Sequence, residues 1–153
     1  MKNYTKGLIF LSIFLVSIKL CAQQLPVREP DINRPSLFRN LPDRINCNVD
    51  DLTTLLQSEV GRTVSFPFAA SMNFQGVVSS VTSRFENTLQ SVVIRSTNLP
   101  GAALSFSKLK KEDGSISYIG RIISFQHGDA YEIILENGQY YFVKKDFYDL
   151  VND

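Results

Sequence analysis

Residues 115–145 read SISYIGRIISFQHGDAYEIILENGQYYFVKK, and this stretch decides the fold. Apolar and β-branched residues fill three runs, which are separated by residues 126–129 and 136–139. The second separator contains Asn137-Gly138, a pair typical of a type I′ turn, because both central residues of that turn need a positive φ. The stretch therefore predicts three consecutive antiparallel strands.

The two-residue turn predicts the pairing of the last two strands. Leu135 lies opposite Tyr140, and Ile133 lies opposite Phe142. Because side chains alternate between the two faces of a strand, one face carries a nearly continuous apolar set. Its members are Ile116, Tyr118, Gly120, Ile122, Tyr131, Ile133, Leu135, Tyr140 and Phe142. We expect this face to form the core.

The turn before this stretch can be assigned by the same reasoning. A three-residue turn at residues 112–114, with Gly114 left-handed, adds Leu104 and Phe106 to the core face. A two-residue turn would place Ala103, Ser105 and Ser107 there instead. The apolar pattern favours the three-residue turn.

The second face of the three strands is less regular. It carries apolar side chains beside one base and one acid: Ile119, Ile123, Phe125, Ile134, Tyr141, Val143, Arg121 and Glu132. A sheet that is apolar on both faces must be covered on both. One helix covers only one face, so the other needs curling of the sheet, the N-terminal arm or a partner.

Four further strands are expected upstream, at residues 63–68, 74–82, 89–95 and 102–108. Pro67 places the first of them at a sheet edge, because proline cannot donate to a ladder. Residues 48–60 predict an amphipathic helix that Asn48 or Asp50 caps and Gly61 ends. The predicted fold is α+β, mainly β: one N-terminal amphipathic helix, then a bent antiparallel meander of six to seven strands that could form a partial barrel.

Residues 1–22 have the features of a bacterial secretory signal peptide. Lys2 and Lys6 precede an apolar run at residues 8–18, and Ala22 offers a small residue for cleavage. The prediction is export to the periplasm or the medium, with no membrane span after cleavage. Lipidation at Cys21 is a less favoured alternative, because residues 18–20 lack the small residue expected before a lipoprotein cysteine.

The mature chain is predicted to have a Pro-rich extended arm at residues 23–46 and a single domain at residues 47–153. Loss of the three leader lysines leaves 13 basic against 15 acidic residues, a net charge of −2. This charge does not favour a nucleic-acid partner. Cys47 is the one cysteine left, so the monomer has no internal disulfide, and we expect this thiol to be buried.

Signals for catalysis and for metal binding are weak. The mature chain has one histidine and one cysteine, without CxxC, HxH or HExxH spacing, so neither a metal site nor a cofactor is predicted. His127 and Asp129 are the candidate catalytic pair, with Asp129 orienting His127 as a general base. Because turns select Gly and Asp for backbone reasons, an ordinary turn is the favoured interpretation. The protein is therefore not predicted to be an enzyme.

The predicted function is an exported, non-enzymatic module that recognises a protein or peptide through an aromatic sheet face or an exposed edge. Inhibitor, propeptide-like and accessory roles all fit, as does a homodimer through a face or an edge. The expected binding residues are Tyr141, Phe125, Ile123, Ile134, Arg121, Glu132, His127 and Asp129. The alternative is a carrier of a small apolar ligand within the curled sheet, in a cavity lined by Tyr118, Tyr131, Phe106 and Phe142. A hydrolase that uses His127 and Asp129 ranks last.

Overall fold

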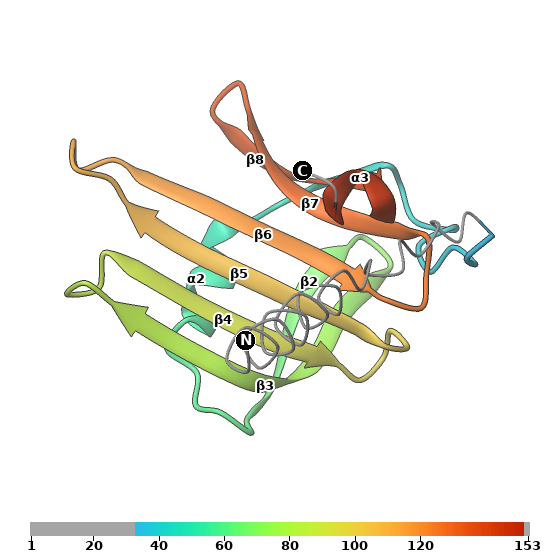
Figure 1. Ribbon diagram of the computed structural model, residues 1–153, viewed down its shortest axis with the longest axis horizontal. Coiled ribbons are helices and arrows are strands. Elements are labelled where there is room, and N and C mark those ends of the chain that lie inside the picture. The colour runs from blue at the N-terminus through green and yellow to red at the C-terminus, as the bar shows by residue number, and fades with distance from the viewer. Residues whose placement is uncertain (1–32, 152–153) are drawn as a thin grey trace, which may run out of the picture. The chain divides into compact units, whose positions relative to one another are not determined.

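Eight antiparallel strands form one sheet, curled into a half-barrel, in the computed structural model, which describes residues 33–151 (Figure 1). The strands are β1 (Arg44–Asn46), β2 (Thr63–Ala69), β3 (Met72–Arg84), β4 (Leu89–Ser96), β5 (Ala102–Lys110), β6 (Ile116–Ser124), β7 (Asp129–Glu136) and β8 (Gln139–Asp146). Their spatial order is β1-β8-β7-β6-β5-β4-β3-β2. The predicted bent antiparallel meander is thus confirmed for β2 to β8, and β1 is an additional strand within the predicted arm.

The predicted register of the C-terminal stretch is also confirmed. Leu135 lies opposite Tyr140 and Ile133 opposite Phe142, while Asn137 and Gly138 have φ angles of 51° and 79°. Positive φ at both positions is what a type I′ turn requires. The turn between β6 and β7 lies at residues 125–128, one residue before the predicted position.

The three-residue turn at residues 112–114 is present as well. The amide of Lys111 donates to the carbonyl of Ser115 over 2.8 Å, and Gly114 has a φ of 82°. Leu104 and Phe106 consequently lie on the core face, and both are fully buried.

The predicted helix is shorter than expected. Helix α2 spans Val49–Leu55, with Asn48 as the N-cap that accepts from the amide of Asp50. After it, amides bond to carbonyls three residues back, as in Leu56 to Thr53 over 3.2 Å. This tighter turn buries Leu56 and leaves Val60 at 64% exposure. The prediction that the helix continues to Val60 was wrong, because the last turn is not α-helical.

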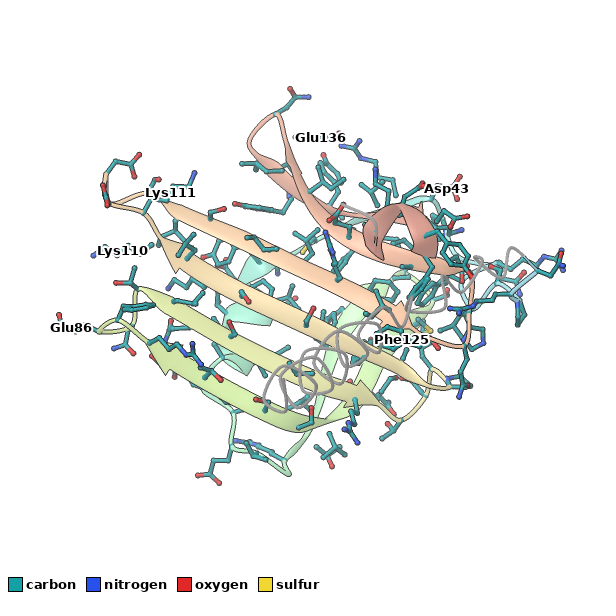
Figure 2. All side chains as sticks on the ribbon, viewed as in Figure 1. Asp43, Glu86, Lys110, Lys111, Phe125 and Glu136 are labelled. Atoms are coloured by element: carbon teal, nitrogen blue, oxygen red, sulfur yellow. The ribbon has the colours of Figure 1, made fainter. Side chains whose placement is uncertain are left out.

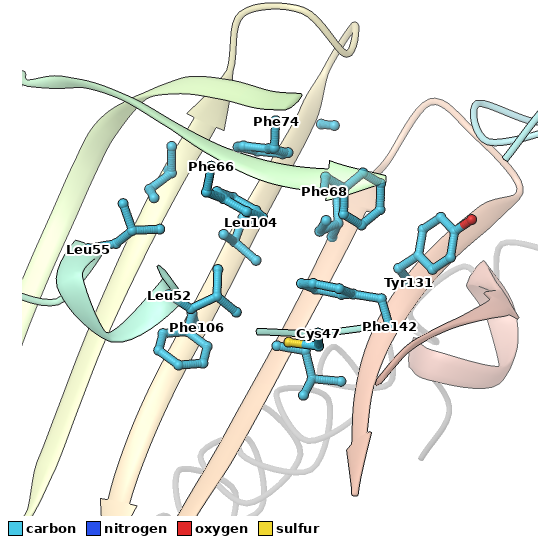
Figure 3. Packing of buried hydrophobic residues seen from close by; sticks show 14 of the residues in the cluster. Cys47, Leu52, Leu55, Phe66, Phe68, Phe74, Leu104, Phe106, Tyr131 and Phe142 are labelled. Atoms are coloured by element: carbon cyan, nitrogen blue, oxygen red, sulfur yellow. The ribbon is translucent and has the colours of Figure 1, made fainter. Parts of the chain in front are cut away.

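The core lies between α2 and the concave face of the sheet (Figure 3). Leu52 and Leu55 of the helix point to the same interior as the aromatic side chains of the strands. The ring of Phe68 packs edge-on against Tyr131 and Phe142, at centroid distances of 5.2 and 5.1 Å. The arm contributes Phe38, which is fully buried against Tyr131. The concave side is thus filled with side chains.

The two edges of the sheet, β1 and β2, approach each other but form no ladder. The amide of Val78 in β3 donates to the carbonyl of Arg62 over 2.9 Å. Because backbone groups alternate along an antiparallel pair, the N–H and C=O groups of Val64 and Phe66 point towards β3, whereas the backbone of Pro67 points away from it. Pro67 therefore faces the open side without an N–H to donate. This agrees with the predicted edge position, because an edge strand does not need the missing donor.

Within the described residues, no helix combines the length and the apolar character needed to cross a membrane. The predicted signal peptide, its cleavage after Ala22, the alternative lipidation at Cys21 and the first part of the arm lie outside these residues.

Candidate functional site

The second face of β6 to β8, on which the sequence predicts binding, is partly covered by the C-terminal helix α3 (Phe147–Val151) (Figure 1). Arg121 and Glu132 are directly opposed on β6 and β7. The guanidinium of Arg121 forms an ion pair with Glu132 at 2.9 Å and donates to the carbonyl of Leu150 in α3 over 3.0 Å. Arg121 therefore holds α3 on the sheet, and Glu132 holds the guanidinium of Arg121 in place.

Tyr141 and Phe125 are also engaged in intramolecular contacts. The guanidinium of Arg44, from β1, lies 3.6 Å from the ring centroid of Tyr141, which is a cation–π arrangement. Phe125 is 70% exposed, and its ring packs edge-on against Phe147 of α3. Figure 2 places Phe125 at one end of the sheet and Lys110 and Lys111 at the other.

His127 and Asp129 have separate partners. The carboxylate of Asp129 accepts hydrogen bonds from the hydroxyl of Ser36 and from the amides of Leu37 at 2.6 Å and Phe38 at 2.8 Å. Asp129 thus anchors the arm, a role that the sequence did not reveal.

The imidazole Nδ1 of His127 lies 2.8 Å from the hydroxyl of Ser124. A serine nucleophile and its general base lie at such a hydrogen-bond distance. Ser124, however, is fully buried, so a substrate cannot reach its hydroxyl in this structure. The contact closes the turn between β6 and β7.

Cys47 is buried, as predicted, with 2% of its surface exposed. Burial raises the pKa of its thiol to about 12, and the charge of Asp51 acts in the same direction. A protonated, buried thiol is a poor nucleophile and a poor metal ligand. In addition, the described residues contain no cluster of three or more His, Cys, Asp or Glu side chains able to hold a metal ion.

The four residues expected to line a ligand cavity pack on neighbouring rings instead. Tyr118 stacks on Phe106 at a centroid distance of 5.7 Å, and Phe68 contacts both Tyr131 and Phe142. Three of the four are fully or almost fully buried, and Tyr118 is half-buried. This packing gives no support to a carrier of apolar ligands within the sheet.

The least paired part of the sheet lies between β6 and β7, whose ladder consists of two residue pairs, Arg121 with Glu132 and Ile122 with Tyr131. Beyond these pairs the β7–β8 hairpin swings away from β6 towards its tip (Figure 1). We call the diverging edges, residues 116–120 of β6 and 133–136 of β7, the β6–β7 fork. By contrast, β5 and β6 stay paired from Ala102 with Ser124 to Lys110 with Ile116.

Backbone groups of both strands face the fork. The bond from Lys111 to Ser115 implies, by alternation, that Ile116 and Tyr118 direct their amides and carbonyls towards β7. The Asn137-Gly138 turn likewise directs those of Leu135 towards β6. One donor is already used, because the amide of Tyr118 bonds to the hydroxyl of Tyr140 over 3.3 Å.

Aliphatic side chains line the fork on both faces. Ile116 and Leu135 belong to the concave face and are 47% and 54% exposed, while Ile119 on the convex face is 55% exposed. The prediction that Ile116 and Leu135 belong to the core was therefore wrong, because the strands separate before reaching them. Of the predicted binding residues, Ile134 lies on β7 beside the convex side of the fork, and it is half-buried.

Gly120 was the sequence signal closest to the fork. A Cβ at this position would lie 2.6 Å from Cδ1 of Ile133 on β7. A lone glycine inside a strand often marks such a close approach or an irregularity of the ladder, but it does not reveal where pairing stops.

No protein-family model, curated protein or solved structure matches this chain.

Proposed function

We propose that this protein is an exported, non-enzymatic module that binds an extended segment of another protein at the β6–β7 fork. The observation that supports the proposal is the end of the β6–β7 ladder after two pairs, beside three aliphatic side chains that are about half exposed. Inhibitor, propeptide-like and accessory roles are all compatible with such binding.

Unpaired strand edges are templates for a further strand. An extended segment that adds to β6 can pair with the backbone of Ile116 and Tyr118, and main-chain bonds of this type give affinity in β-augmentation. The bond between the Tyr118 amide and the Tyr140 hydroxyl is long at 3.3 Å, so a better aligned acceptor from the partner can replace it.

Side chains of the bound segment would set the specificity. Alternate residues of a strand point to opposite faces, and the fork offers aliphatic side chains on both: Ile116 and Leu135 on one face, Ile119 on the other. The expected partner segment is therefore extended, lacks proline at its paired positions and carries apolar residues on both faces.

The proposal can be tested by photocrosslinking. The mature chain carries p-benzoylphenylalanine at Ile119 or Leu135 and is irradiated in the native exported fraction. The matched control carries the probe at Val60, which is at 64% somewhat more exposed than the two fork positions but lies outside the fork. We expect a common adduct from the two fork positions and none from Val60. No adduct at the fork, or the same adduct from all three positions, would overturn the proposal.

The identified partner then allows a direct check of strand addition. On binding, hydrogen exchange should slow at the fork-facing amides of Ile116 and Leu135, and substitution of Ile119 by lysine should weaken binding while Val60→Lys should not. Slower exchange of amides in other parts of the chain, with no change at Ile116 and Leu135, would contradict strand addition at the fork. An adduct between two copies of this chain would make the fork a homodimer interface in place of a site for another protein.

A further inference from the structure

A second opening lies where the two edges of the half-barrel approach each other. A groove of about 410 Å³ runs between β1, β2 and the start of α2, within the range of about 300–1,000 Å³ that is usual for ligand sites. Its wall is mostly apolar and includes Pro42, Pro67, Phe68 and Ala69. Its polar side chains all come from β1 and the start of α2: Arg44, Asn46, Asn48 and Asp51. We call this the seam groove.

Within residues 33–151, no strand pairs with the outer backbone edge of β1, which borders the groove. The amide of Lys144 donates to the carbonyl of Asp43 over 2.8 Å, and the amide of Cys47 donates to the carbonyl of Tyr140 over 3.0 Å. By alternation, the backbone groups of Arg44 and Asn46 point away from β8. Pro67 on the facing strand has no N–H, so β2 does not fill this edge.

The polar side chains at the groove differ in whether they already have a partner. The guanidinium of Arg44 is already held by Glu136 and by the ring of Tyr141, and the side-chain oxygen of Asn46 accepts from Gln139 over 2.9 Å. Among the described residues, no ion pair neutralises the half-buried carboxylate of Asp51. The groove therefore combines apolar walls with one unpaired negative charge.

We propose that the seam groove binds a lysine or arginine side chain of an extended segment in a partner protein. The aliphatic stem of the side chain packs against Phe68 and the two prolines, and its cationic head pairs with Asp51. Long basic side chains bury their stems in this way while the charge stays at the polar end. The backbone on either side of the basic residue pairs with Arg44 and Asn46 of β1. This inference does not depend on the β6–β7 fork, which involves other strands.

The test uses two capped peptides, acetyl-Val-Lys-Val-Val-amide and the same peptide with norleucine in place of lysine, titrated into the ¹⁵N-labelled mature chain. Norleucine retains the stem and lacks the charge. We expect the lysine peptide to bind about threefold to tenfold more tightly, as a partly buried ion pair allows, and to shift the amide signals of Arg44, Asn46 and Asp51. Sodium chloride should reduce the difference.

Adjacent aspartates supply a matched pair of variants. Asp51→Asn should abolish the preference for lysine, whereas Asp50→Asn should retain it, because Asp50 is exposed and does not line the groove. Ala70→Trp fills the groove from an exposed position of its wall and should weaken the binding of both peptides. This variant tests the groove if Asp51→Asn does not fold. Equal binding of the two peptides, no binding of the lysine peptide, or shifts confined to the fork would each overturn the proposal.

Discussion

Substitution of Asp129 by alanine tests the view that this residue is structural. Asp129 is 9% exposed at the start of β7, and its carboxylate accepts from Ser36, Leu37 and Phe38 of the arm. Alanine removes all three hydrogen bonds and leaves the amide of Phe38 buried without this acceptor. We expect the arm to lose its attachment and Phe38 to pack less well on Tyr131.

The size of the effect follows from the kind of bond that is lost. A hydrogen bond to a charged group contributes about 1.5–3 kcal/mol, and a buried donor left unpaired costs about 1–3 kcal/mol. The hydroxyl of Ser36 and the amide of Leu37 are partly exposed and regain water, which discounts their share. We therefore expect the free energy of unfolding to fall by about 3–5 kcal/mol, a large part of the ~5–15 kcal/mol that stabilises a typical domain.

Urea unfolding monitored by far-ultraviolet circular dichroism measures this change, since the chain contains no tryptophan. The control is Glu112→Ala, an exposed acid in the turn after β5, which should shift the midpoint only slightly. Trypsin should also cleave Asp129→Ala faster at Arg39, an exposed residue of the arm. If Asp129→Ala and Glu112→Ala have the same midpoint and the same cleavage rate, the anchoring role is refuted.

Three further changes test the core, a close backbone contact and the buried thiol. Leu52→Ala should lower the free energy of unfolding in urea by about 2–5 kcal/mol, because it opens a cavity under the sheet; a loss under about 1 kcal/mol would contradict the packing of α2. Gly76→Ala should be more destabilising than Gly120→Ala in the same assay. A Cβ at residue 76 would lie 2.5 Å from the backbone oxygen of Arg95, which cannot move easily, whereas the atom nearest to a Cβ at residue 120 is the end of a flexible side chain. In the folded chain the pKa of the Cys47 thiol is about 12, so this thiol ionises at lower pH in the unfolded chain. The free energy of unfolding should therefore fall as the pH rises from about 9 towards 12, by up to ~1.4 kcal/mol per pH unit. In urea titrations at each pH, Cys47→Ala should reduce the dependence of the free energy of unfolding on pH. An unchanged dependence would refute its assignment to Cys47.

Turn chemistry made the C-terminal half of the fold predictable. The pair Asn137-Gly138 selects one turn type, and that turn sets the register of β7 and β8. The position of Gly114 together with the apolar pattern then placed Leu104 and Phe106 on the same face. These inferences succeeded because each depends on residues close together in sequence.

Features that depend on distant residues were not predictable in the same way. Strand β1 has three residues and pairs with β8, so that Arg44 lies opposite Val143. Nothing in its local pattern separates it from an extended arm. The role of Asp129 likewise requires the arm to return to β7, and a His-Gly-Asp turn alone does not show which segment its carboxylate binds.

The fork and the seam groove border the same part of the molecule, the three-strand unit of β7, β8 and β1. Two residue pairs join this unit to β6, and no ladder joins it to β2. Its attachment therefore relies on side chains such as Tyr131 and Phe142, which are buried in the core. Packing of this kind holds a unit in place while its backbone edges stay free, whereas a closed barrel would use them up. An open half-barrel with a well-packed interior thus leaves parts of β6, β7 and β1 outside the ladders of the described sheet.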